Sequence, residues 1–172
     1  MDHVRYPIGN FEPITRLSAE QRKGLTNQIA GLTGTLRDLT KHLHKEQLHT
    51  SYRPGGWNIQ QIIHHLADND MNAFVRFKRA LTENEPEASS YREDLWAELN
   101  DYRDVPVQTS LMLLEALHTR FAILLRGMTE ADFRRTLRTQ VLGTITLDIA
   151  LQRLVWHNLH HISHIQMIRG MR

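Results

Sequence analysis

Four of the eleven histidines fall within the ten-residue stretch "WHNLHHISHI", which begins at Trp156. Two pairs in this stretch have i, i+4 spacing, His157 with His161 and His160 with His164. Because successive helical residues turn by about 100°, the four imidazoles would form one stripe beside an apolar face. This spacing lets two imidazoles reach a single metal ion, as in helical zinc sites. Sequence geometry leaves the choice between the two pairs open.

A third metal ligand is expected from another helix, because a catalytic zinc site usually has three protein ligands and one open position. The stretch "IIHHLADNDMN" offers two adjacent candidates, His64 and His65. By rotation about the helix axis, His65 lies slightly nearer the apolar face, which favours it slightly as the ligand. Asp68 is near enough to orient an imidazole or a bound water. The remaining histidines are expected to be ordinary, partly exposed helix residues, namely His3, His42, His44, His49 and His118.

Length and composition indicate one domain over residues 1–172, with residues 1–17 as an extended N-terminal arm. The chain has 172 residues and 41% hydrophobic content, enough for a single sizeable core. Its formal charge of +2 is not the basic excess that nucleic-acid binding requires. Because cysteine is absent, His, Asp and Glu are the only strong metal ligands available. No signal peptide or membrane-spanning run is evident, so we expect a cytoplasmic protein without a membrane partner.

Helix-capping patterns precede the segments with helical apolar periodicity. Ser18 with Gln21, and Asn58 with Gln61, have the spacing of a capping box, and Thr146 can cap the last segment. Apolar residues at three- and four-residue steps then predict four long helices, over residues 19 to about 47 or 48, 59–81, about 107–127 and about 147–168.

The connections between these helices define the type of bundle. Residues 82–106 contain Pro86 and many charges, and only "DLWAELNDY" resembles a helical turn or two. Such a long crossover suits a bundle whose helices are not joined simply up and down. A short helix is expected after Thr129, and "TLRTQVLGTIT" predicts either a small hairpin or a plain loop. The expected fold is an all-α four-helix bundle with a long crossover between helices 2 and 3.

Several motifs resemble one known family. "GGWNIQQIIHHLADNDMNAFVRFKRALTE", "SLMLLEALHTRFAILLRGM", "GTITLDIAL" and "WHNLHHISHI", together with the opening "RYPIGNFEP", resemble the YfiT branch of the DinB-like superfamily over nearly the whole chain. The resemblance implies a four-helix bundle, often a homodimer, that holds zinc or nickel. By motif, the implied ligands are His65, before the aliphatic residue of "HLAD", and the pair His157 and His161 in the "WHxxHH" run. His160 and His164 are additional, so the second pair remains possible.

The same resemblance implies the expected activity, a metal-dependent hydrolase that activates a water on a His3 divalent-metal site, with zinc as the first choice of ion. Members of the superfamily are also similar to S-transferases that use bacillithiol or mycothiol, so a low-molecular-weight thiol is the alternative to a small-molecule hydrolysis substrate. The competing hypotheses are a non-catalytic metal-binding stress-response bundle and a metal-free structural dimer. Asp68 and Glu12 are the carboxylates considered as general base, and neither is assigned that role.

Two tryptophans and three basic residues give weaker signals. Trp57 and Trp156 could form the wall of a substrate pocket, but a Trp at a helix end more often belongs to the core. Arg76, Lys78 and Arg79 could attract an acidic thiol cofactor, although such charges usually form a solvated face. We therefore expect all three basic side chains to be solvated.

Overall fold

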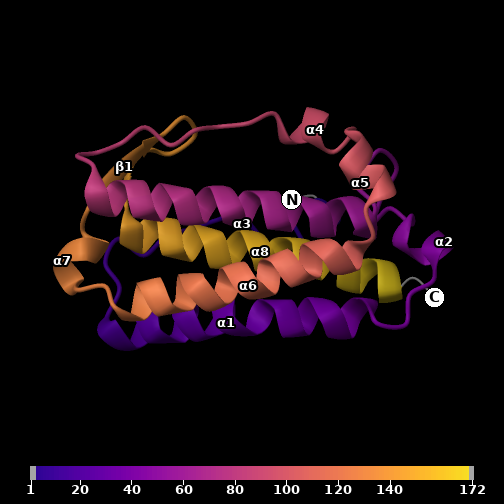
Figure 1. Cartoon of the computed structure of the whole chain (residues 1–172), viewed down its shortest axis with the longest axis horizontal. Helices are drawn as coiled ribbons and strands as arrows, with labels where there is room; N and C mark the ends of the chain where they lie inside the picture. The colour runs from indigo at the N-terminus through magenta and orange to yellow at the C-terminus, as the bar shows by residue number, and fades with distance from the viewer. Residues whose placement is uncertain (1–2, 171–172) are drawn as a thin grey trace.

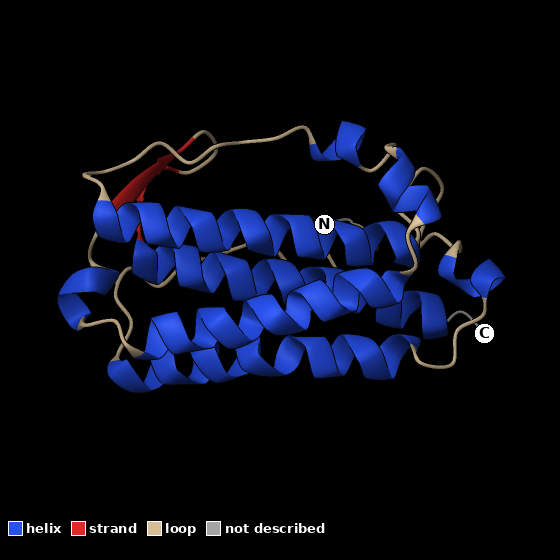
Figure 2. Ribbon diagram, viewed as in Figure 1, coloured by secondary structure: helices blue, strands red, loops and turns tan. Residues whose placement is uncertain are grey.

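Four long helices form the body of the protein. In the computed structural model, which describes residues 3–170, they lie side by side along one direction (Figure 1). The elements in chain order are α1 (Ala19–Thr40), α2 (Lys45–Leu48), α3 (Ile59–Thr82), α4 (Glu93–Trp96), α5 (Asn100–Asp104), α6 (Val107–Arg126), α7 (Glu130–Phe133), β1 (Thr136–Thr139), β2 (Gly143–Thr146) and α8 (Leu147–Gly170). Strands within the described residues occur only in one hairpin (Figure 2). The predicted four-helix bundle is confirmed.

The long crossover determines the directions in which the helices run. Helices α6 and α8 each pack against both α1 and α3. Residues 83–106 return along the length of the bundle before α6 begins, so α6 runs parallel to α3 and α8 runs antiparallel to α3 (Figure 1). The first turns of α3 therefore lie beside the last turns of α8, and both segments carry candidate histidines.

The first helix ends earlier than predicted. The capping box at its start is present, with Ser18 Oγ accepting from the Gln21 N–H and Gln21 Oε1 accepting from the Ser18 N–H. However, α1 stops at Thr40, and residues 45–48 form the separate helix α2. The cause is local, because the Gln47 side chain accepts a hydrogen bond at 2.8 Å from the N–H of His44 and so starts a new helix there.

For residues 136–146 the sequence predicted either a hairpin or a loop, and the structure shows a hairpin. Strands β1 and β2 pair antiparallel with Leu137 opposite Ile145, and both side chains are buried in the core. Gly143, at the start of β2, has φ of 65°, a conformation that residues with a Cβ rarely adopt. The crossover joins the hairpin, because the Ala88 N–H donates to the Arg138 carbonyl at 2.8 Å. The hairpin and the crossover thus form one continuous layer over the helices.

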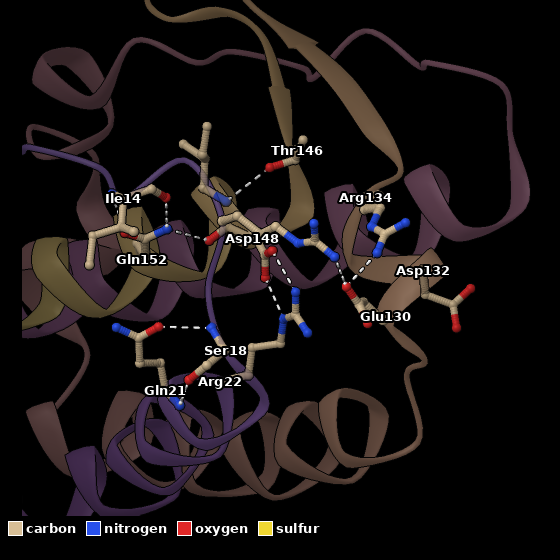
Figure 3. A network of polar contacts seen from close by, with 12 residues as sticks. Ile14, Ser18, Gln21, Arg22, Glu130, Asp132, Arg134, Thr146, Asp148 and Gln152 are labelled. Carbon is tan, nitrogen blue, oxygen red and sulfur yellow. Dashed lines mark hydrogen bonds and ion pairs between the residues drawn. The ribbon is translucent and has the colours of Figure 1, made fainter.

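A buried ion pair joins the start of α8 to α1 (Figure 3). Arg22 donates from Nε and Nη2 to the two carboxylate oxygens of Asp148, at 2.7 and 2.8 Å, and the two side chains are only 9% and 3% exposed. One turn further along α8, the Gln152 side chain exchanges two hydrogen bonds of 2.8 Å with the backbone N–H and carbonyl of Ile14. These bonds hold the N-terminal arm against α8.

A second buried polar network lies inside the core. The fully buried Asp70 carboxylate accepts hydrogen bonds from His118 Nε2 at 2.7 Å and from Asn158 Nδ2 at 2.9 Å. The second ring nitrogen of His118 lies 2.9 Å from the hydroxyl of Thr33. The expectation that His118 is partly exposed is therefore wrong. Its position one turn after Leu114 places it on the buried face of α6, where these partners satisfy both nitrogens.

Candidate metal centre

Three imidazoles predicted as metal ligands meet between α3 and α8. His65 comes from α3, and His157 and His161 come from α8. One ring nitrogen of each lies within 4.8 Å of the other two. The Nε2 atoms of His65 and His157 are 3.2 Å apart, and the three pairs of ring centroids are separated by 5.1, 4.9 and 4.7 Å.

Helix geometry and core packing position these rings. His157 and His161 are one turn apart on α8, so their side chains project from the same side of that helix. His65 lies in the second turn of α3, which runs beside this part of α8 in the opposite direction (Figure 1). Leu66 and Ile162, each next to a candidate ligand, are buried in the core and fix the rotation of the two helices.

Burial keeps these imidazoles neutral. His65 is 1% exposed and His161 is 8% exposed. Burial lowers the pKa of His65 to about 3. Burial, and then the neighbouring rings, hold the pKa of His157 and of His161 well below the ordinary value. All three side chains therefore carry a free lone pair at neutral pH, which is the form that binds a metal ion.

The spacing of the ring nitrogens fits a divalent ion. Two nitrogens that are 2.0–2.1 Å from one tetrahedral zinc ion are about 3.4 Å apart, close to the 3.2 Å between His65 Nε2 and His157 Nε2. The Nδ1 atoms of His65, His157 and His161 are buried without a hydrogen-bond partner among residues 3–170. An ion held through the Nε2 atoms of His65 and His157 would leave their Nδ1 atoms unpartnered as well, so the fit to a metal ion rests on the spacing. The donor set, three neutral imidazoles, is one that zinc and nickel both accept.

The adjacent histidine of α3 points elsewhere. His64 Nδ1 lies 2.8 Å from the Ser110 hydroxyl, and His64 Nε2 lies 3.1 Å from the Val105 carbonyl oxygen. Both partners belong to α6 or to the residues just before it. The structure thus directs His64 toward α6 and His65 toward α8.

Neither carboxylate considered as a general base faces the three rings. Asp68 Oδ2 accepts a hydrogen bond of 2.6 Å from the Tyr102 hydroxyl. Burial raises the pKa of Asp68, and the Tyr102 bond partly opposes that rise. Asp68 does not orient the ring of His65, whose Nδ1 has no partner in the described part of the chain. Glu12 is exposed on the N-terminal arm.

A second group of nitrogens involves the remaining histidines of the cluster. One ring nitrogen each of His160, His161 and His164 lies within 4.8 Å of the others. The Tyr52 ring stacks on His164 with centroids 3.9 Å apart, and the Tyr6 ring lies 6.0 Å from that of His160. The two groups share His161, so one nitrogen of this ring cannot serve both.

An aromatic side chain that sequence reasoning assigned to the core also contacts the candidate ligands. The Trp57 ring lies 4.6 Å from that of His65 and 6.0 Å from that of His161, measured between centroids. Its position directly before the cap of α3 was visible in the sequence, but its contact with two imidazoles was not. Trp156 packs 5.0 Å from His160 and contacts Phe11 of the arm at 5.8 Å.

A pocket of about 220 Å³ opens beside the candidate metal centre, and His157 is part of its lining. Its walls come from α3, the crossover, the hairpin and α8. Arg76 lines this pocket and is half-buried, so the expectation that it belongs to a solvated face is wrong. Lys78 is exposed, and Arg79 forms an ion pair with Glu83 at the surface, as a solvated face predicts.

The chain and its fold belong to a known family. Residues 10–165 match the DinB superfamily, and the chain belongs to this family. The class of protein is therefore a DinB-type helical bundle with a cluster of histidines between two of its helices.

Named relatives cover nearly the whole chain. A protein from Geobacillus thermodenitrificans (strain NG80-2), named "Putative metal-dependent hydrolase", is 42% identical over 170 residues, which are 98% of this chain and 96% of the relative. A protein of the same description from Oceanobacillus iheyensis is 42% identical over 164 residues, or 94% and 93% of the two chains. The solved structure of YfiT from Bacillus subtilis, described as a probable metal-dependent hydrolase with an unusual four-helix bundle topology, matches with a TM-score of 0.94 at 38% identity and covers 98% of both chains.

Among the described residues, no helix combines the length and the apolar composition that a membrane span requires.

Proposed function

We propose that this chain is a metal-dependent hydrolase that holds one zinc ion through His65, His157 and His161. The observation that carries the proposal is the convergence of three neutral imidazoles from two helices, with two nitrogens at the spacing of zinc ligands. The names of the relatives support the same activity.

When bound, a zinc ion with three imidazole ligands lowers the pKa of a water in its open position and so supplies a nucleophile near neutral pH. The chain's own residues prepare the site for this chemistry. The three imidazoles stay neutral because burial opposes their protonation. Trp57 packs against two of the rings and limits their movement. The pocket beside His157 gives a substrate access to the same place.

Metal analysis of the purified protein tests the ligand assignment. The protein loaded with zinc and then dialysed should retain about one ion per chain, and His157→Ala should retain none. His164→Ala is the matched control, because this ring belongs to the second group and its loss should leave the bound zinc in place. A wild-type protein that retains no zinc would overturn the proposal.

Assays with the zinc-loaded protein distinguish hydrolysis from thiol transfer and from metal binding alone. Turnover of activated esters, absent in His157→Ala, is the expected result. Conjugation of a low-molecular-weight thiol to an electrophile, without ester turnover, would instead identify a thiol S-transferase. Tight zinc binding with neither reaction would identify a non-catalytic metal-binding protein.

We also propose that the protein is a homodimer. Several large apolar side chains on α6 are exposed in the single chain, with Met112 58%, Leu113 45% and Ile123 65% exposed. A second copy that covers this face would remove apolar surface from water. Sedimentation should give twice the chain mass of 20.1 kDa, and a monomer at micromolar concentration would contradict dimerisation.

A further inference from the structure

Two arginines line the pocket without a close ion pair to a carboxylate. Arg76 on α3 and Arg153 on α8 are both half-buried, and neither forms an ion pair with any described residue. Burial lowers the pKa of both guanidinium groups. By contrast, Arg22 and Arg138 have a raised pKa because each hydrogen-bonds a carboxylate.

The protein compensates these two cations only in part. Arg76 donates to the backbone carbonyl of Ser89, and its Nε has no partner among the described residues. Arg153 lies over the ring of Trp156, with Cζ 4.7 Å from the centroid. Glu93, the one carboxylate in the pocket lining, attracts Arg153, but burial raises the pKa of Glu93 more than Arg153 lowers it, and a single carboxylate cannot balance two guanidinium groups. The pocket therefore has an excess of partly desolvated positive charge, which a bound anion would compensate.

The arginines lie along the pocket from the metal centre. Arg153 is one helical turn from His157, about 6 Å along α8. On α3, Asn69 lies one turn after His65, and Arg76 lies about two turns after Asn69. Small and apolar residues line the pocket between Arg76 and His157, namely Ala73, Ala150 and Leu154. A substrate that extends from the arginines to His157 would have an anionic group, a short apolar spacer and a reacting group near His157.

We propose that the pocket selects small esters whose acyl part carries a carboxylate, and that Arg76 and Arg153 bind this carboxylate. The guanidinium fork matches the two oxygens of a carboxylate, and the volume of about 220 Å³ fits a small molecule. In the reaction, water forms a bond to the acyl carbon and the acyl C–O bond breaks. The alcohol leaves with one proton of the water, and the second proton is released because the product acid ionises. The assignment of the reacting group rests on the proposed hydrolase function.

Paired substrates test this selectivity in the zinc-loaded protein. Mono-4-nitrophenyl glutarate carries the carboxylate, and 4-nitrophenyl pentanoate is its neutral counterpart of equal acyl length. After correction for spontaneous hydrolysis, Arg76→Met and Arg153→Met should each raise KM for the charged ester about tenfold to a hundredfold, because each removes a charge-assisted hydrogen bond. The KM for the neutral ester should change less than twofold. Arg92→Met is the control, since Arg92 pairs with Asp94 at the surface. Equal effects on both esters would overturn the proposal.

A binding measurement does not depend on turnover. Calorimetry with the zinc-loaded protein should show binding of glutarate but not of glutaramide. The double variant Arg76→Met, Arg153→Met should lose at least tenfold in glutarate affinity while it retains one zinc per chain. If glutarate bound the metal alone, the double variant would bind it unchanged, and the carboxylate site would be wrong. If glutarate binding depends on both arginines but no ester is hydrolysed, the proposed function fails and the carboxylate site stands.

Lysine variants test the proposal if a methionine variant does not fold. If either methionine variant lacks the wild-type circular dichroism spectrum, Arg76→Lys and Arg153→Lys replace it, since they keep the charge but not the two-pronged geometry. Each should still raise KM for the charged ester selectively. Lysine variants that fold and bind glutarate with wild-type affinity would exclude recognition by the guanidinium fork.

Discussion

Replacing the two neighbouring histidines of α3 should have different consequences. His65→Ala removes one of three candidate ligands, whereas His64→Ala removes a side chain that contacts Ser110 and the Val105 carbonyl. We therefore expect the first change to act on zinc affinity and the second on folding stability.

The size of each effect follows from the contacts. Zinc sites with four protein ligands contribute about 10–16 kcal/mol, or about 2.5–4 kcal/mol per ligand, so His65→Ala should weaken zinc binding roughly 10²–10³-fold. His64→Ala should reduce zinc affinity less than about tenfold, because this ring does not face the ion. It should instead cost about 1–3 kcal/mol of unfolding free energy, because the hydrogen bonds to the Ser110 hydroxyl and to the partly buried Val105 carbonyl are both lost.

Equilibrium zinc titration against a chromophoric chelator measures the affinities, and urea denaturation of the metal-free protein measures the stabilities. If His64→Ala weakens zinc binding more than His65→Ala, the rotation of α3 in this structure is wrong. The grouping of His65 with His157 and His161 would then be wrong as well.

Three further changes test the core and the charge state of the site. Arg22→Met should lower the unfolding free energy by about 3–5 kcal/mol in urea denaturation, since it leaves the Asp148 carboxylate buried and unpaired, whereas Arg92→Met at the surface should leave the urea midpoint nearly unchanged. Asp70→Ala should lower the unfolding free energy by about 3 kcal/mol or more without loss of zinc, because His118 and a buried asparagine amide lose their acceptor. A decrease below about 1 kcal/mol would contradict the buried network. The metal-free protein should lose stability as the pH falls from about 6.5 toward 4. In this range the histidines of the unfolded chain gain protons, whereas two histidines of the cluster, with pKa values lowered to about 3 and about 4, stay neutral in the folded protein. An equal urea midpoint at pH 7.5 and pH 5 would refute this prediction.

The sequence by itself determined the elements and the candidate ligands. Capping boxes at Ser18 and Asn58 and the apolar periodicity located the long helices, because these signals depend on contacts within a few residues. The i, i+4 spacing of the histidines was equally local, since one helical turn places two rings on one side of a helix. The early end of α1 was missed because Gln47 can cap a new helix as readily as it can extend the old one.

Tertiary packing decided what these local signals left open. The choice of which histidine pair meets His65 depends on the rotation and axial offset of α8 against α3, and buried side chains of both helices fix these. The position of His118 one turn after Leu114 is a local signal for the buried face, but only the presence of Asp70 across the bundle makes His118 part of a buried network. The pocket is the feature that local sequence patterns predict least. Its walls come from four segments distant in the chain, and they meet because the crossover returns along the bundle and pairs with the hairpin over α3 and α8.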